Sequence, residues 1–288
     1  MRLFLRLLAQ LATVSAVALA GSVAVGAVHW NMPLTLVLGL GTAVLALLAY
    51  AWVVRRTERR APVEVTRGGA AAALGRGMLI GWVMFAAVIV NIAFLGDYRV
   101  DGWGSVSGAV ALFGFSAAAA VTEELIFRGV LFRIIEGRIG TWLALALTAA
   151  LFGMSHLFNA HATVWGALSI AVEAGAMLGA AYVATRNLWV PIGVHFAWNF
   201  AEGGVFGTNV SGTDSPQGLL HGVLSGPTAI SGGEFGPEAS VYALAVGVLV
   251  TVVFLMVARR RGRLVPLRRR TVAADATVTA DATATLSR

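Results

Sequence analysis

Two residue types are missing from this sequence, and charge of either sign is scarce. Its 288 residues include no cysteine and no lysine, and only 12% are charged. Without cysteine the chain has no disulfide, no thiolate nucleophile and no cysteine-based zinc or iron–sulfur site. The formal charge of +7 therefore comes from arginine alone. These arginines stand in short clusters at the ends of apolar runs. A nucleic-acid surface needs an exposed basic face interleaved with aromatics, so we expect no nucleic-acid partner.

Long apolar runs dominate the rest of the chain. Hydrophobic residues make up 58% of the sequence, and its mean hydropathy is +0.81. Soluble domains are usually about 45–50% apolar. We therefore predict an all-α, polytopic transmembrane helix bundle of about eight spans, embedded in the lipid bilayer of the plasma membrane. The predicted spans are residues 3–28, 34–54, 77–95, 105–127, 141–157, 163–184, 188–206 and 240–258.

The first apolar run begins like a secretory signal peptide. Arg2 and Arg6 precede it, and the sequence Ala18-Leu-Ala20 before Gly21 is typical of a cleavage site. The run continues beyond that point and is long enough to span a membrane, so we expect it to be retained as a helix. His29 and Trp30, at its end, are typical of a membrane interface.

The arginines also orient the predicted helices. They cluster before the first span, between the second and third, and after the fourth, sixth and eighth. The alternate loops are poor in arginine, and residues 207–238 contain none. Because positive residues are enriched on the cytoplasmic side of membrane proteins, we expect both termini in the cytoplasm.

This pattern divides the chain into five predicted segments, of which the third is an irregular Gly- and Ser-rich loop outside the cell. They are three helices with a basic cytoplasmic loop (1–100), core helices four to seven (105–206), the external loop (207–238), the last helix (239–258) and a cytoplasmic tail that is basic and then disordered (259–288).

Adjacent carboxylates interrupt the fourth apolar run. An ionisable group at mid-bilayer costs about 2.5–3.5 kcal/mol, so Glu123, Glu124 and Arg128 need a structural or chemical reason to be there. Positions four apart share one helix face, so Glu124 can pair with Arg128. Glu123 is rotated by about 100° from Glu124 on an α-helix. We therefore expect a structural ion pair between Glu124 and Arg128, with Glu123 free to face a cavity; one packing network of all three is the alternative.

His156 lies at a depth that matches Glu123. The turn between the fourth and fifth helices is expected near Ile139 and Gly140, and both residues would then lie about 24 Å from it. The arginines from Arg128 onward predict that the fourth helix leaves the membrane just past Phe127. That would place Glu123 about one turn inside the cytoplasmic boundary.

The seventh run adds His195 and Asn199 on one helix face, and Glu202 extends that face at i+7. One carboxylate, two imidazoles and one carboxamide from three helices are chemically suited to a single site. The roles of Glu202 and of Glu173, in the sixth run, stay open.

The three motifs, in this order on successive apolar helices, resemble the CPBP family of intramembrane proteases, which includes type II CAAX prenyl endopeptidases and bacterial Abi-type proteins. The motifs are Glu123-Glu124-x-x-x-Arg128, Phe152-x-x-x-His156 and His195-x-x-x-Asn199, and the resemblance covers about residues 105–204. It implies hydrolysis of a peptide bond near the membrane surface, with a peptide or protein as the partner; CAAX substrates are prenylated proteins. It also implies Glu123 as the catalytic carboxylate, completed by His156, His195 and Asn199, with Glu124 and Arg128 as supporting members.

Two mechanisms fit these residues. In the one we favour, Glu123 is the general base, His156 helps to hold the water, and His195 and Asn199 donate hydrogen bonds to the oxyanion. In the other, His156 and His195 bind Zn²⁺ together with Glu123, and the metal activates the water. Asparagine is a poor zinc ligand but a good hydrogen-bond donor, so no cofactor is favoured.

Three readings without this chemistry are also open. The same groups could line a proton or solute pathway in a transporter, or the chain could be a non-catalytic immunity or scaffold protein. Ser155, beside His156, could suggest a serine protease, but the second glycine of a Gly-x-Ser-x-Gly elbow is missing.

Overall fold

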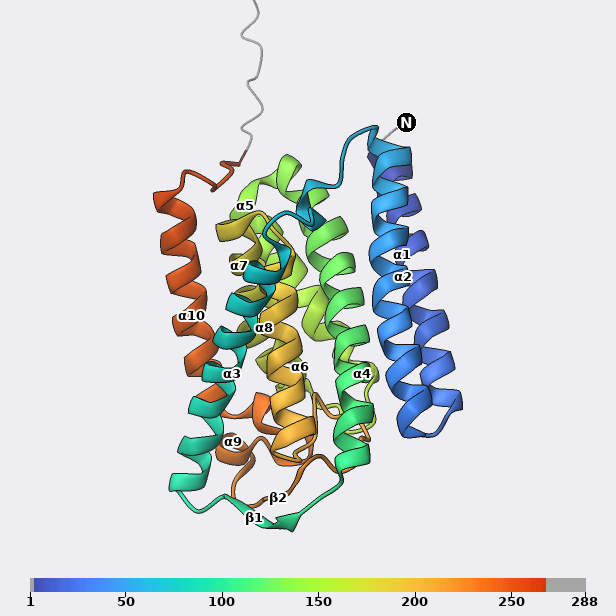
Figure 1. Cartoon of the computed structure of the whole chain (residues 1–288). Helices are drawn as coiled ribbons and strands as arrows, with labels where there is room; N and C mark the ends of the chain where they lie inside the picture. Colours follow the sequence, from blue (N-terminus) through green and yellow to red (C-terminus); the bar gives the residue numbers. More distant parts are fainter. Residues whose placement is uncertain (1–2, 268–288) are drawn as a thin grey trace, which may run out of the picture.

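The computed structural model describes residues 3–267 of the chain, which form a helix bundle (Figure 1). The disorder predicted for the later part of the tail (259–288) concerns residues outside the described ones. The helices, in chain order, are α1 (Leu3–Ala27), α2 (Met32–Glu58), α3 (Ala70–Phe94), α4 (Val106–Glu124), α5 (Arg133–Ser155), α6 (Val164–Ile170), α7 (Met177–Thr185), α8 (Trp189–Asn199), α9 (Thr228–Ser231) and α10 (Val241–Arg260). The all-α prediction holds for nearly all of this part of the chain.

A small sheet is the exception to it. Strand β1 (Tyr98–Trp103) pairs antiparallel with β2 (Leu220–Leu224), and Tyr98 lies opposite Leu224. The Tyr98 hydroxyl donates a hydrogen bond to the Phe206 carbonyl (2.9 Å), and burial raises the pKa of Tyr98 to about 12. The prediction of an irregular 207–238 loop is therefore wrong in part, because β2 and α9 lie within it. Contacts with residues more than a hundred positions away order this segment.

Six helical stretches among residues 3–267 are long and apolar enough to cross a membrane. One of them, Val106–Phe158, contains both the fourth and the fifth predicted spans. The seventh predicted span is found as α8 and the turn that follows it, a shorter helix outside this set of six. The chain is therefore an integral membrane protein by length and composition. The six stretches cover seven of the eight predicted spans, and the count of eight stays a prediction.

The expected turn between the fourth and fifth spans is confirmed at Gly140. Its φ of 77° and ψ of 168° interrupt the helix within α5. Glycine reaches this conformation at little cost, whereas a side chain is strained there. A Cβ at this position would also come within 2.8 Å of the Leu267 backbone nitrogen.

Three π-helical turns interrupt the core helices. They are η2 (Leu125–Phe132) after α4, η4 (Ala171–Ala176) between α6 and α7, and η5 (Phe200–Val205) after α8. π-Turns are rare and often lie at functional sites, because each shifts the register of the side chains that follow. Here two of them directly follow Glu124 and Asn199.

Close backbone contact fixes α8 against α3. A Cβ on Gly77 would lie 2.2 Å from the Val190 carbonyl oxygen, and one on Gly193 would lie 2.4 Å from that of Leu74. Only residues without a side chain allow this approach. The packing determines where α8 presents His195 and Asn199.

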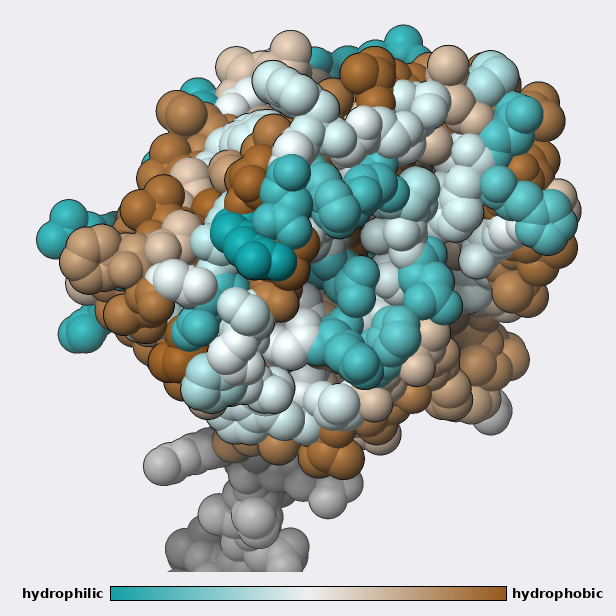
Figure 2. Space-filling model, turned by 90° about the horizontal axis from the view of Figure 1, so that it is seen from below, coloured by the Kyte–Doolittle hydropathy of each residue, from teal (hydrophilic) through white to brown (hydrophobic). Residues whose placement is uncertain are grey.

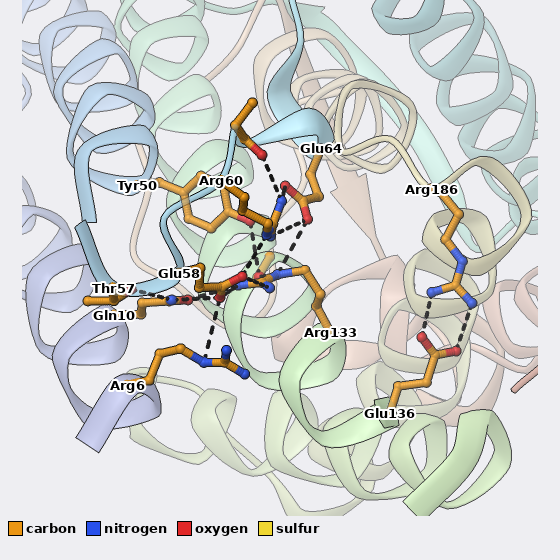
Figure 3. A network of polar contacts seen from close by, with 12 residues as sticks. Arg6, Gln10, Tyr50, Thr57, Glu58, Arg60, Glu64, Arg133, Glu136 and Arg186 are labelled. Atoms are coloured by element: carbon orange, nitrogen blue, oxygen red, sulfur yellow. Dashed lines mark hydrogen bonds and ion pairs between the residues drawn. The ribbon is translucent and has the colours of Figure 1, made fainter. Parts of the chain in front are cut away.

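The arginine-rich end of the bundle is held together by ion pairs (Figure 3). Glu58, the last residue of α2, accepts hydrogen bonds from Arg133 (2.7 and 3.0 Å), Arg60 (2.6 Å) and Gln10 of α1 (2.8 Å). Arg60 also donates two hydrogen bonds to Glu64 (2.7 and 3.1 Å). The network links the first two helices to α5.

The opposite end carries the sheet and α9, and we call it the strand end (Figure 1). Seen from that side, polar side chains gather in the middle and apolar ones surround them (Figure 2). The start of α1 and the end of α10 both lie at the arginine-rich end (Figure 1).

Candidate active site

Glu124 lies at the centre of a buried ion cluster. Its Oε1 accepts a hydrogen bond from Arg128 (2.7 Å), so the pair predicted from the i, i+4 spacing is present. Arg128 is only 2% exposed, and its other terminal nitrogen donates to the carbonyls of Ala174 (3.1 Å) and Gly175 (3.0 Å) in η4. The guanidinium thus has a partner on each side, which a buried cation requires.

The same oxygen of Glu124 also holds His195. The distance from His195 Nδ1 to Glu124 Oε1 is 3.1 Å. An ionised carboxylate only accepts hydrogen bonds, so Nδ1 carries the proton and Nε2 is left for other partners. The spacing argument assigned Glu124 to Arg128 alone and did not identify this second contact.

Glu123 points away from that cluster. Its side chain is 31% exposed, whereas that of Glu124 is fully buried. Its Oε2 lies 3.9 Å from His195 Nε2, too far for a direct hydrogen bond but close enough for a shared water. The two nitrogens of His195 therefore face the two adjacent glutamates.

His156 is oriented by its own helix. Its Nδ1 lies 2.8 Å from the Phe152 carbonyl oxygen, which can only accept a hydrogen bond. Nε2 is therefore the unprotonated nitrogen of the neutral ring. Phe152 also packs against both imidazoles, with ring centroids 4.9 Å from His156 and 6.1 Å from His195. The Phe-x-x-x-His motif thus positions two histidines.

A cavity of about 910 Å³ brings the predicted catalytic residues together. Glu123, His156, His195 and Asn199 all line it, and they come from α4, the end of α5 and α8. Glu124 and Arg128 lie outside its lining, buried behind it. The side chains of the four lining residues can reach a molecule in the cavity, whereas the other two can only support them.

Comparison with known protein families gives a match to the segment that contains these residues. Residues 105–201 match the family model "Type II CAAX prenyl endopeptidase Rce1-like". This match places the segment in the CAAX intramembrane protease family. The match includes all three motifs, so the resemblance inferred from them is confirmed. Neither a curated protein nor a solved structure matches the chain.

The CAAX protease segment also contacts residues that the motifs did not indicate. A second cavity of about 20 Å³, close to the size of one water molecule, lies against His156, His195 and Asn199. Its far wall includes Glu238, which accepts hydrogen bonds from Trp198 (3.0 Å) and Ser211 (2.6 Å). Glu238 comes from the strand end, and no local pattern in the sequence indicates that it folds inward.

The two glutamates of open role are both buried. Glu173 lines the small cavity, and its Oε1 has no hydrogen-bond partner among the described residues. Glu202 has no partner on either carboxyl oxygen within residues 3–267, and it lines neither cavity. The expectation that Glu202 extends the face of His195 and Asn199 is therefore wrong, because the π-turn η5 begins at Phe200 and changes the register.

The residues proposed as zinc ligands were His156, His195 and Glu123. Their tautomers suit a metal, since both histidines hold Nδ1–H in a hydrogen bond and leave Nε2 free. Within residues 3–267, however, no three His, Asp or Glu side chains are arranged to hold a metal ion. In this conformation these residues do not fit zinc.

The expected depth of Glu123, about one turn inside the cytoplasmic boundary, stays a prediction. Helical structure continues beyond Phe127 to Ile139, and Arg128 and Arg133 are each in an ion pair. Glu123 lies about 26 Å along the helix from Val106, and roughly 24 Å of helix follow it. Glu123 is therefore near the middle of this helical stretch, which is longer than the roughly 30 Å apolar core of a bilayer.

Proposed function

We propose that this protein is an intramembrane endopeptidase of the plasma membrane that hydrolyses a peptide bond of a polypeptide substrate in the large cavity. The observation that carries the proposal is that Glu123, His156, His195 and Asn199 line one cavity, while Glu124 and Arg128 buttress it from behind. A general base, two imidazoles and an amide donor are the groups that water-dependent amide hydrolysis needs.

Glu123 takes the role of general base. A water between its carboxylate and the nearby imidazoles loses a proton to Glu123 as its oxygen attacks the scissile carbonyl carbon. The carbonyl oxygen becomes an oxyanion, the C–N bond then breaks, and the proton passes to the leaving nitrogen. The products are a carboxylic acid and an amine, which ionise to a carboxylate and an ammonium group. The 3.9 Å gap between Glu123 Oε2 and His195 Nε2 leaves room for a bridging oxygen to take part.

Asn199 and His195 stabilise the oxyanion. The amide of Asn199 can donate a hydrogen bond in any protonation state. Neutral His195, with its proton on Nδ1, cannot donate from Nε2, so only the imidazolium can serve. Glu124 beside Nδ1 stabilises that cation, much as a carboxylate stabilises the histidine in a serine protease triad. This second contact of Glu124 gives it a positioning role beyond its ion pair.

Cleavage in proteoliposomes tests the proposal. The full-length protein is incubated with a farnesylated peptide ending in a CAAX sequence and with a library of peptides that carry a transmembrane anchor, and products are read by mass spectrometry. We expect cleavage by the wild type and none by Glu123→Gln. Glu202→Gln, a buried glutamate outside both cavities, is the matched control and should cleave normally. Wild-type protein that cuts neither probe would favour the non-catalytic or transporter reading.

A further inference from the structure

The large cavity reaches the surface at the strand end. Its lining includes His29 and Trp30 after α1, Asn159 after α5, and Thr213 and Asp214 in the segment before β2. The side chain of Asp214 is 79% exposed, and His29 is exposed as well. Within residues 3–267, the loops of the arginine-rich end (59–69, 138–140, 186–188 and 261–267) contribute nothing to the lining. A molecule dissolved in water therefore enters from the strand end.

The two ends of the bundle differ sharply in charge. Among the described residues, the strand end has a single arginine, Arg99, and carries Asp97, Asp101, Asp214 and Glu234. The opposite end holds the arginines at 55–60, 67, 138, 186 and 259–263. Arginine is retained on the cytoplasmic side of membrane proteins, so this asymmetry places the strand end outside the cell.

One wall of the cavity is open to lipid. Leu19 of α1 lines the cavity although it is 67% exposed, and Ser22 and Gly26 on the same helix are exposed lining residues too. Among its described residues, α1 buries only Gln10, Val14 and Val25. The wall of the cavity is thus continuous with the lipid-facing surface of the first helix. An apolar segment within the bilayer can therefore move along α1 from the lipid into the cavity.

We propose that the substrate is a membrane-anchored polypeptide whose scissile bond is presented from the extracytoplasmic side of its anchor. The inference rests on the proposed peptidase function and adds the side of entry and the substrate class. The anchor lies in the bilayer beside α1, and the adjoining stretch of chain enters the cavity in extended form. A volume of about 910 Å³ is ample for a short peptide segment. A prenylated C-terminus in the cytoplasm would approach the wrong end of the bundle.

The absence of cysteine makes the side of entry directly measurable. Single cysteines are placed at the cavity mouth (Asp214→Cys), on its inner wall (Ala118→Cys) and in the exposed basic loop (Gly68→Cys). Intact cells are treated with a small, membrane-impermeant thiol reagent, and labelling is compared with that of permeabilised cells. Wild-type protein, without any thiol, supplies the background.

We expect the cysteines at 214 and 118 to be labelled in intact cells, the inner one at least tenfold more slowly. The cysteine at 68 should react only after permeabilisation. Labelling at 68 but not at 214 in intact cells would overturn the orientation. Labelling at 214 but not at 118 before permeabilisation would overturn entry from the strand end. Ala119→Cys, also on the inner wall, replaces Ala118→Cys should that variant fail to fold.

The substrate class is tested by comparing cells that express the wild type with cells that express Glu123→Gln. New peptide ends in the membrane fraction should map to the extracytoplasmic flank of membrane-anchored proteins and be lost with Glu123→Gln. Loss of the last three residues from cytoplasmic prenylated proteins would overturn the substrate class. Thiol labelling does not depend on catalysis, so an inactive wild type with the expected labelling would refute the peptidase function and leave the orientation standing.

Discussion

Two groups of buried or half-buried glutamates differ in how fully their carboxylates are paired. At the arginine-rich end, Glu58 is held by Arg133, Arg60 and Gln10, and Glu136 is held by Arg186 and Thr141. In the core helices, one oxygen each of Glu123, Glu124 and Glu173 and both oxygens of Glu202 have no partner among the described residues, and of these residues Glu123 and Glu173 line a cavity.

An unpaired buried oxygen costs free energy, typically about 1–3 kcal/mol. At the arginine-rich end, enough arginines are present to give each of these carboxylates a hydrogen-bond partner. The difference between the two groups indicates that full pairing serves stability, whereas an oxygen left unpaired beside a cavity is available for chemistry.

The largest effect should come from removing the unpaired carboxylate that faces the large cavity. Glu123→Gln keeps the shape of the side chain but removes the base, so we expect peptide cleavage to fall about 10²–10⁴-fold. The variant should unfold at the same temperature as the wild type, because Glu123 has only the loose 3.9 Å contact with His195 to lose. Cleavage rates and thermal unfolding in detergent provide both readouts. Normal cleavage would refute the assignment of Glu123.

The next largest effect should fall on stability, at the paired neighbour. Glu124→Gln leaves Arg128 buried without a counter-charge, which costs about 3–5 kcal/mol. The double variant Glu124→Gln, Arg128→Met removes both charges and should recover much of the loss. It should not recover activity, since His195 would still lack the carboxylate at Nδ1. Equal stability of the single and double variants would contradict the ion pair as the cause.

These contrasts show what the sequence could predict. The Glu124–Arg128 pair and the break at Gly140 follow from helix geometry and glycine conformation, which act locally, and both were predicted. Glu202 was misplaced because a π-turn changes the register without any local signal.

The long-range contacts of the site lay outside the sequence patterns for a different reason. Arg133 looks like a residue at a membrane boundary, but its partner Glu58 lies 75 residues away in the sequence. The inward fold of Glu238 likewise depends on Trp198, in another helix. Such long-range contacts were beyond the reach of a periodicity argument.

A smaller loss is expected within the fully paired network. Glu58→Gln removes the charge that holds Arg133 and Arg60, and Glu64 remains within 3.6 Å of Arg133 as a partial substitute. We expect a loss of about 1.5–3 kcal/mol in the free energy of unfolding, the range for hydrogen bonds to charged groups. Cleavage per folded molecule should be unchanged. A Glu58→Gln variant with wild-type stability but impaired cleavage would contradict the view that the paired glutamates serve stability and not catalysis.

The smallest effect should come from Glu202, the buried carboxyl with no cation beside it. An ionised carboxylate without a partner is too costly in an apolar interior, so the group carries its proton and resembles a neutral amide in shape and polarity. Glu202→Gln should therefore change the free energy of unfolding by less than about 1 kcal/mol, the net worth of one hydrogen bond. The thermal unfolding of Glu202→Gln is compared with that of Glu58→Gln. Replacing a neutral carboxyl should change stability less than replacing an ionised one. A loss as large as that of Glu124→Gln would mean that Glu202 is charged. The lack of a hydrogen-bond partner would then not identify the carboxylates that take part in catalysis.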